Sequence, residues 1–331
     1  FEKASVRVPD PENKLAKEVH PKIREALKEE LEHHEETFLS GSYSRRVQEG
    51  HLSDVDIIVV LKDPDGKYAN SAEAALKDIQ DAAGESDLVR RTRKRVRAVK
   101  VFLHGHVFTE ASPSVEGQEF TVDLVAARRP ASGRGLLLAR HLPDEGYDDW
   151  QLLDPEGQRK AAIDKNGECG GLYIPAVRIV KHWNQGVGKP LRSYHAEAIL
   201  WHALTGSVDY DEAVVRFFDA AYEALAPKAR TTDPGDPDSY VDDRLEDDER
   251  AAARIKVEKA RSAAHEAYEA EDIEDALEGW VKVFGSSFPA PSTMPERMRG
   301  ILNSGQATAI GTGIQSGSGR DIIRSRSWRG L

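Results

Sequence analysis

Residues 55–61 form a strand-length run of β-branched and aliphatic side chains that is interrupted only by Asp56. Such a run predicts a buried β-strand, and the turn-forming residues 62–66 close it. Asp54 stands directly before the run. Because successive side chains on a strand point to opposite faces, Asp54 and Asp56 are expected to point the same way. The segment therefore predicts a strand that presents two carboxylates at one end.

The rest of the chain predicts a mixed α/β part followed by a helical part. A long helix is expected at residues 12–37, where apolar residues recur at helical spacing. A second helix is expected at residues 71–83, and two further strands are expected at residues 96–103 and 119–127. From about Tyr173 onward the strand patterns stop. Helices are then expected at residues 174–184, 193–205, 210–226, 249–270 and 273–283.

These patterns predict three segments. Residues 1–165 form the first lobe, and residues 166–295 form the helical lobe. Residues 296–331 are rich in Gly and Ser and are expected to be a flexible tail. Within the helical lobe, residues 231–248 are rich in Asp, Pro and Gly, which predicts a solvated loop.

The composition limits the setting of the protein. The chain has 331 residues and a formal net charge of −11, which disfavours a surface built wholly for nucleic acid. Residues 90–95 are a basic cluster, for which a solvated surface is a commoner explanation than a phosphate-binding patch. No run approaches the roughly 18–20 apolar residues of a membrane helix. The single cysteine, Cys169, excludes an internal disulfide, which is typical of a reducing compartment. Together, these two observations lead us to expect a cytoplasmic protein with no membrane partner.

A Gly-Ser pair, Gly41 and Ser42, precedes the acidic strand. Glycine allows backbone N–H groups to approach a phosphate closely, and the serine hydroxyl adds a donor. Asp54 and Asp56 are costly on one face without a cation, and their oxygen atoms suit Mg²⁺. The pattern therefore predicts a phosphate site beside two Mg²⁺ ions, for which Mn²⁺ can substitute. One ion would activate an attacking hydroxyl, and the other would neutralise a leaving pyrophosphate.

A third carboxylate is expected on a neighbouring strand. Asp123 lies in the middle of the β-prone residues 119–127, where an unpaired carboxylate is unfavourable. Either a metal ion or a salt-bridge partner would remove that cost. We therefore predict that Asp123 completes the metal site with Asp54 and Asp56 and helps to orient or deprotonate the attacking hydroxyl.

Several of these motifs resemble one known family. They are GSYSR at residues 41–45, SDVDI at residues 53–57, IVKHWN at residues 179–184, KPLRSYHAE at residues 189–197, and WVKVFG at residues 280–285, followed by FP. This set is similar to the bacterial cGAS/DncV-like nucleotidyltransferases of anti-phage signalling systems, which are relatives of cyclic GMP–AMP synthase and of the oligoadenylate synthases.

The resemblance implies an α+β fold, with a polymerase-β-like nucleotidyltransferase lobe that contains a mixed sheet and a C-terminal helical lobe. It implies that Lys181 and Ser193 grip the donor triphosphate and that Tyr194 stacks on a base. It further implies that ATP, GTP or a pyrimidine nucleotide is joined into a cyclic oligonucleotide with release of pyrophosphate, and that no nucleic acid is obligatory. Some relatives are also attached to other proteins through their C-terminus, so accessory defence proteins and a conjugation machinery are candidate partners.

Two other functions use the same motifs. A linear oligoadenylate synthase, a poly(A) polymerase or a tRNA end-adding enzyme would use the same carboxylates on a different acceptor. A long RNA acceptor needs a continuous basic track, which the net charge of −11 disfavours. A silent nucleotide-sensing scaffold is the non-enzymatic alternative, and the presence of Asp54, Asp56 and Asp123 favours activity over it.

Overall fold

The computed structural model describes residue 6 and residues 10–50, 54–104 and 120–289. The chain divides into two compact units, of which one comprises residues 8–161 and the other begins at residue 162. Within the described residues, no helix combines the length and the apolar character needed to cross a bilayer.

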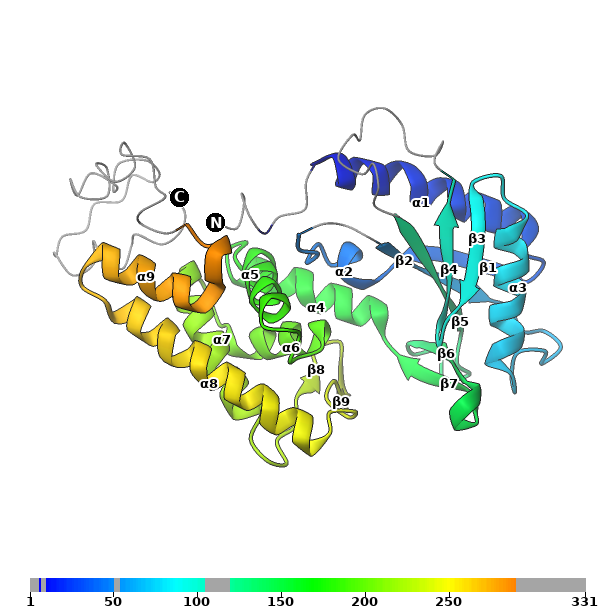
Figure 1. Ribbon diagram of the computed structural model, residues 1–331. Coiled ribbons are helices and arrows are strands. Elements are labelled where there is room, and N and C mark those ends of the chain that lie inside the picture. The colour runs from blue at the N-terminus through cyan, green and yellow to red at the C-terminus, as the bar shows by residue number, and fades with distance from the viewer. Residues whose placement is uncertain (1–5, 7–9, 51–53, 105–119, 290–331) are drawn as a thin grey trace. The chain divides into compact units, whose positions relative to one another are not determined.

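The unit of residues 8–161 is built on a mixed β-sheet (Figure 1). Its central strands run in the order β1-β2-β5-β4-β3, and β6 and β7 extend from β5. Strands β2 and β5 are parallel, whereas the other neighbours are antiparallel. The strands are β1 (His34–Leu39), β2 (Asp54–Leu61), β3 (Val89–Lys94), β4 (Ala98–Leu103), β5 (Thr121–Arg128), β6 (Leu136–Leu142) and β7 (Tyr147–Leu153). The helices of this part are α1 (Asp10–Glu30), α2 (Gly41–Ser44), α3 (Ala72–Gly84) and the 3-10 helix η4 (Pro143–Glu145).

The two faces of the sheet differ in what covers them. The odd-numbered positions of β2, from Val55 to Leu61, are buried in one core with α1 and α3. Ile58 and Val60 point to the opposite face, where they pack with residues of β5 and β6. A fully buried aliphatic side chain contributes roughly 1.5–3 kcal/mol, so the α1/α3 face supplies most of the stabilising burial. Asp54 and Asp56 share the parity of Ile58 and therefore lie on the other face.

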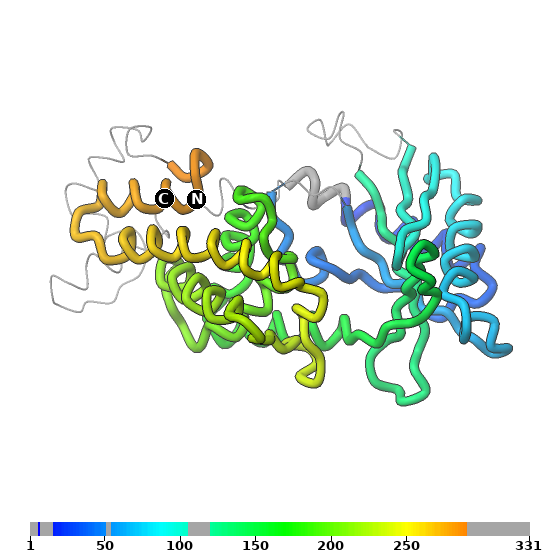
Figure 2. The backbone as a smooth tube through the Cα atoms, turned by 60° about the horizontal axis from the view of Figure 1, so that its bottom comes forward, coloured from blue at the N-terminus to red at the C-terminus, as the bar shows by residue number. Residues whose placement is uncertain are grey.

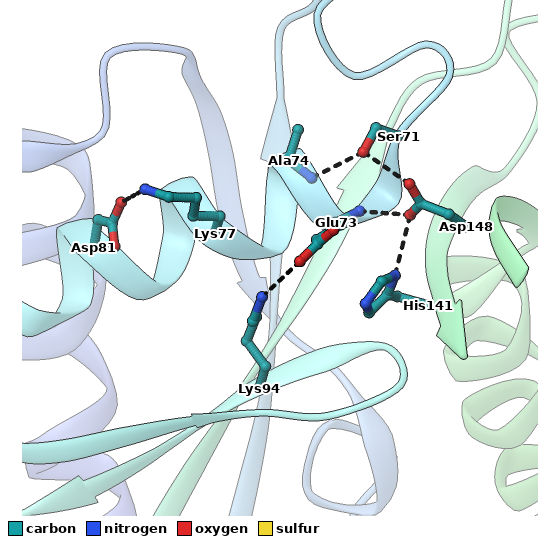
Figure 3. A network of polar contacts seen from close by, with 8 residues as sticks. All are labelled: Ser71, Glu73, Ala74, Lys77, Asp81, Lys94, His141 and Asp148. Carbon is teal, nitrogen blue, oxygen red and sulfur yellow. Dashed lines mark hydrogen bonds and ion pairs between the residues drawn. The ribbon is translucent and has the colours of Figure 1, made fainter. Parts of the chain in front are cut away.

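Helix α3 is joined to the β6–β7 hairpin by polar contacts around Asp148 (Figure 3). Ser71 caps the helix by accepting a hydrogen bond from the backbone of Ala74. The carboxylate of Asp148 accepts hydrogen bonds from the Ser71 hydroxyl at 2.8 Å and from the Glu73 backbone N–H at 2.7 Å. Its position near the N-terminus of α3 also suits a negative charge, and His141 lies 3.3 Å away. These contacts fix where α3 begins relative to the sheet.

The unit that begins at residue 162 is mainly helical, and its long helix α8 packs between α7 and α9 (Figures 1 and 2). Trp183, Phe217 and Phe218 meet edge to face in its core. The elements of this part are α4 (Pro155–Glu168, which begins in the first unit), α5 (Tyr173–Gly186), α6 (Ser193–Ala203), α7 (Tyr210–Ala224), β8 (Thr232–Asp233), β9 (Asp236–Tyr240), α8 (Asp247–Glu269), α9 (Ile273–Phe284) and the 3-10 helix η5 (Gly285–Ser287).

The predicted α+β class, with a mixed sheet followed by a helical region, is confirmed. The helix predicted at residues 12–37 was wrong at its C-terminal end, because α1 ends at Glu30 and residues 34–39 form β1. Val19, Ile23, Leu27 and Leu31 carry the helical spacing as buried residues, and the apolar pattern ends with them. Beyond that point the chain gains backbone pairing with β2 instead.

Three further segments add to the comparison with the prediction. The basic residues 90–95 lie largely in the edge strand β3, and their exposure agrees with the predicted solvated surface, although Arg91 stacks over the Phe102 ring at 3.8 Å. The prediction of a solvated loop at residues 231–248 was wrong in part. This segment contains the β8–β9 hairpin, and its Asp233 and Asp242 are buried. Charged side chains can be buried there because Asp242 pairs with Arg250 at 2.9 Å. Strands β6 and β7 had no sequence-based prediction.

Candidate active site

The two central strands bring the three predicted carboxylates together. Strands β2 and β5 pair in parallel so that Asp56 is opposite Asp123, and Asp54 is opposite Thr121. Paired residues on neighbouring strands point to the same face, so Asp54, Asp56 and Asp123 lie on the face away from α1 and α3. The local cause is the placement of an acidic residue at matching positions of two apolar strands.

The Gly-Ser turn lies directly against this carboxylate set. The backbone N–H of Ser40 donates to the carbonyl oxygen of Asp56 at 2.9 Å, which extends the β1–β2 pairing to the start of the turn. Gly41 follows with φ of 62°, and a Cβ at this position would lie 1.8 Å from Oδ2 of Asp56. Only glycine therefore allows this backbone to approach the Asp56 carboxylate so closely. Ser42 is the next residue, within the four-residue helix α2.

The carboxylates are in unfavourable electrostatic surroundings for three negative charges. Burial, followed by the charges of Asp54 and Asp123, raises the pKa of Asp56 to about 6. Burial also raises the pKa of Asp123, against the opposing effect of the Lys100 ammonium group. Asp54 is about half exposed, with 51% of its side chain accessible. A cation at this face would relieve the repulsion and stabilise the ionised carboxylates.

Basic side chains adjoin the same set. Lys100 of β4 is opposite Asp123 in the antiparallel β4–β5 pair, and its Nζ lies 3.3 Å from Oδ1 of Asp123 and 3.7 Å from Oδ2 of Asp54. An open pocket of about 470 Å³ extends from the carboxylates toward the end of β3. Its lining residues are Ser40, Gly41, Asp56, Ile58, Arg95, Val96, Arg97, Ala98, Asp123, Val125 and Leu138. A pocket lined by both carboxylates and arginines suits a metal-bound phosphate ester.

The donor chemistry of this site fits hard divalent cations. All three side chains offer carboxylate oxygen atoms, and Oδ1 of Asp123 is buried without a hydrogen bond, at ion-pair distance from Lys100. In the part of the chain that the structure describes, no three Asp, Glu, His or Cys side chains converge closely enough to enclose an ion. The side chain of Lys100 instead lies within ion-pair distance of two of the three carboxylates.

The three residues predicted from the helical motif lie on neighbouring helices of the other unit. Lys181 is on α5 and is buried, with 7% of the residue exposed, whereas most lysines lie at the surface. Ser193 is the first residue of α6 and is exposed. Tyr194 follows it, and its hydroxyl donates to Oδ1 of Asp233 at 2.6 Å. Trp183, by contrast, is a core residue that packs against Phe217 and Phe218.

Sequence reasoning missed Lys100 and Arg95 as parts of the site. A signal was available for Lys100, because it is the one charged residue inside the strand-forming segment 98–103. It could not be connected with Asp123 without the register of β4 against β5. The tail predicted at residues 296–331 lies outside the described residues.

Comparisons with known proteins agree with this geometry. Residues 20–107 match the family described as Nucleotidyltransferase domain. A probable cyclic AMP-AMP-GMP nucleotide synthase of Salmonella paratyphi B is 29% identical over 161 residues, which is 45% of this chain and 42% of that protein. The alignment thus spans less than half of that relative. A cyclic AMP-AMP-AMP synthase of Acinetobacter sp. (strain ATCC 27244 / 9458) is 25% identical over 321 residues, which is 89% of this chain and 86% of that protein.

The fold is also found among solved structures. The structure of E. coli MS115-1 CdnC with ATP superposes with a TM-score of 0.65 at 18% sequence identity. The match covers 86% of this chain and 96% of CdnC. At this identity the similarity concerns the fold, and it extends over both the sheet and the helical region.

Proposed function

We propose that this chain joins nucleoside triphosphates into a cyclic oligonucleotide and releases pyrophosphate. The premise is that it has the nucleotidyltransferase domain and the fold of the bacterial cGAS/DncV-like enzymes. The observation that carries the proposal is the pairing of Asp56 with Asp123 on one sheet face, with Asp54 on the same face and the Gly41 backbone against Asp56. The curated relatives, which are synthases of cyclic trinucleotides, support this choice of product class.

In the proposed reaction, the hydroxyl of one nucleotide attacks the α-phosphate of another. Asp54, Asp56 and Asp123 would hold two divalent cations, Mg²⁺ or Mn²⁺, which supply charge neutralisation for the attacking oxygen and the pyrophosphate. Asp123 would accept or orient the proton of the attacking hydroxyl, since its buried Oδ1 makes no hydrogen bond. The backbone of Gly41 and the hydroxyl of Ser42 would donate to phosphate oxygen atoms. Positioning and charge stabilisation of this kind account for most of the acceleration in phosphoryl transfer.

The helical-lobe residues are assigned by the family resemblance. We propose that Lys181 and Ser193 bind the triphosphate of the donor and that Tyr194 stacks on a base. The hydrogen bond from Tyr194 to Asp233 supports the last assignment, because it restricts the orientation of the ring. ATP, GTP or a pyrimidine triphosphate remains a candidate substrate. A cytoplasmic location and accessory defence proteins, including a machinery that acts on the C-terminus, stay predictions.

The proposed reaction is tested by analysis of its products. Purified protein is incubated with Mg²⁺ or Mn²⁺ and labelled nucleoside triphosphates, singly and mixed, and the products are treated with phosphatase and identified by mass spectrometry. A phosphatase-resistant cyclic oligonucleotide is expected. Linear products, or transfer to added RNA, would assign the site to the alternative enzymes instead.

The carboxylates are tested in the same assay. Replacing Asp54 and Asp56 together by Ala is expected to abolish product formation without unfolding the protein. The control makes the same change of charge at two exposed positions, Asp65→Ala with Asp144→Ala, and is expected to keep activity. Unchanged turnover in the first double variant would disprove the assignment of the active site.

A further inference from the structure

Lys100 is placed unusually for a lysine in a strand. Its neighbours in β4, among them Val99 and Val101, are buried, and only 17% of the Lys100 side chain is exposed. A lysine is rarely buried in this way unless it is paired. The register of β4 against β5 directs Lys100 to the carboxylate face, directly opposite Asp123.

The ammonium group of Lys100 has three oxygen neighbours, one of which accepts a hydrogen bond and two of which lie at ion-pair distance. Oγ1 of Thr121 accepts a hydrogen bond at 3.1 Å. Oδ1 of Asp123 lies at 3.3 Å and Oδ2 of Asp54 at 3.7 Å, both at ion-pair distance. The lysine thus bridges two strands and lies between two carboxylates that the proposed function assigns to metal binding.

We propose that Lys100 is a positioning residue that competes with the divalent cation for Asp54 and Asp123. This inference rests on the proposed function, because it takes those two side chains as metal ligands. The positive charge of Lys100 beside the carboxylate oxygen atoms of Asp54 and Asp123 repels a divalent cation that approaches the same atoms. The bond to Thr121 gives the ammonium group a partner to keep when the carboxylates turn to the ion. Free cations would therefore bind weakly, and the ion would enter best with the phosphates of a nucleotide, which bring their own negative charge.

The size of the effect follows from Coulomb's law. A unit charge and a divalent cation about 5 Å apart repel each other enough, even with a solvent-like dielectric constant, to weaken binding at least about tenfold. Removal of the charge from Lys100 should therefore strengthen metal binding, whereas removal of a residue that merely supports the fold would weaken it. The opposite sign separates the two roles.

The experiment measures the affinity of the nucleotide-free protein for Mn²⁺ by electron paramagnetic resonance, at about pH 8, where the carboxylates are ionised. The variants are Lys100→Met, which keeps the aliphatic stem, and Lys100→Gln, which also keeps a donor for Thr121. Lys100→Arg keeps the charge. Lys94→Met, on the neighbouring strand β3, removes a lysine that pairs with Glu73 at 2.9 Å and serves as the matched control.

We expect Lys100→Met and Lys100→Gln to bind Mn²⁺ at least about tenfold more tightly than the unmodified protein, and the other two variants to bind as it does. Equal or weaker binding in both neutral variants would overturn the role of Lys100. Circular dichroism identifies a variant that does not fold. If one of the two neutral variants, Lys100→Met or Lys100→Gln, does not fold, the Mn²⁺ affinity of the other one tests the proposal. The double variant Asp54→Ala with Asp56→Ala separates the two proposals. If it binds Mn²⁺ as the unmodified protein does, the metal site of the proposed function fails as well.

Discussion

The close approach of Gly41 to Asp56 makes a single methyl group the sharpest probe of the site. In Gly41→Ala the new Cβ would lie 1.8 Å from Oδ2 of Asp56 and 2.7 Å from its Cγ, whereas ordinary van der Waals contacts begin at 3.4 Å. The carboxylate or the turn must therefore move by about 1.6 Å, which is 3.4 minus 1.8. Asp56 lies in the central strand β2, between β1 and β5 and opposite Asp123, so its freedom to rearrange is small.

Two effects of different size are expected from this change. The φ angle of 62° at Gly41 is left-handed, and alanine there costs about 1–2 kcal/mol of folding stability. A displacement of about 1 Å at a catalytic group costs about 100-fold in rate. We therefore predict a moderately destabilised protein that loses at least about 99% of its nucleotidyltransferase activity, because the displacement exceeds that distance.

Gly66→Ala provides the matched control. Gly66 also has a left-handed φ, of 74°, but a Cβ there meets nothing within 4 Å. Both variants are compared by urea denaturation and by the initial rate of pyrophosphate release with mixed nucleoside triphosphates. Gly66→Ala should share the loss of stability and keep the activity. If Gly41→Ala were as active as this control, the argument that Gly41 sets the position of Asp56 would be refuted.

Three further changes test other parts of the structure. Tyr194→Phe removes the hydroxyl that bonds to Asp233. Steady-state kinetics should show KM for the nucleotide raised about five- to tenfold with little change in kcat. A fall in kcat alone would contradict an orienting role. Burial lowers the pKa of His195 to about 4, so the unfolded chain takes up a proton before the folded one as the pH falls below about 6.5. The contribution of His195 to stability should thus fall by about 2 kcal/mol between pH 7 and pH 5, and urea titrations at both pH values should show that His195→Gln lacks this contribution. Asp148→Ala removes two acceptors from the first turn of α3 and should cost about 1 kcal/mol in urea denaturation, whereas the exposed neighbour Asp149→Ala should cost little; equal effects would argue against this anchor.

The strongly periodic elements were predictable because their patterns are local. The run at residues 55–61 became β2, and the helices at residues 174–184 and 273–283 became α5 and α9 with boundaries shifted by at most two residues. The shared face of Asp54 and Asp56 also followed from strand alternation alone. Asp123 was expected beside them because a carboxylate in an apolar strand needs a cation, and the parallel pairing of β2 with β5 brings it opposite Asp56.

The missed features depend on contacts that are distant in the sequence. Strand β1 is polar enough to continue a helical pattern, and only its pairing with β2 makes it a strand. Strand β3 is an edge strand with exposed Arg side chains, so its composition resembles a loop. Lys100 illustrates the same limit at the site, since its partner Asp123 is specified by the β4–β5 register and not by any local motif.

The division of the sheet into two faces explains how a folded chain can hold three carboxylates so close together. Val55, Ile57, Val59 and Leu61 fill the core under α1 and α3, and this burial stabilises β2 whatever its other face carries. Asp56 lies on the face without those helices. Its repulsion with Asp54 and Asp123 lowers the stability of the fold, but the burial on the opposite face outweighs this cost. That unrelieved repulsion is what a cation would remove on binding, so the same arrangement that costs stability provides binding energy for the metal–nucleotide complex. A charged site of this kind can be built on a central strand because the strand is held from the opposite side.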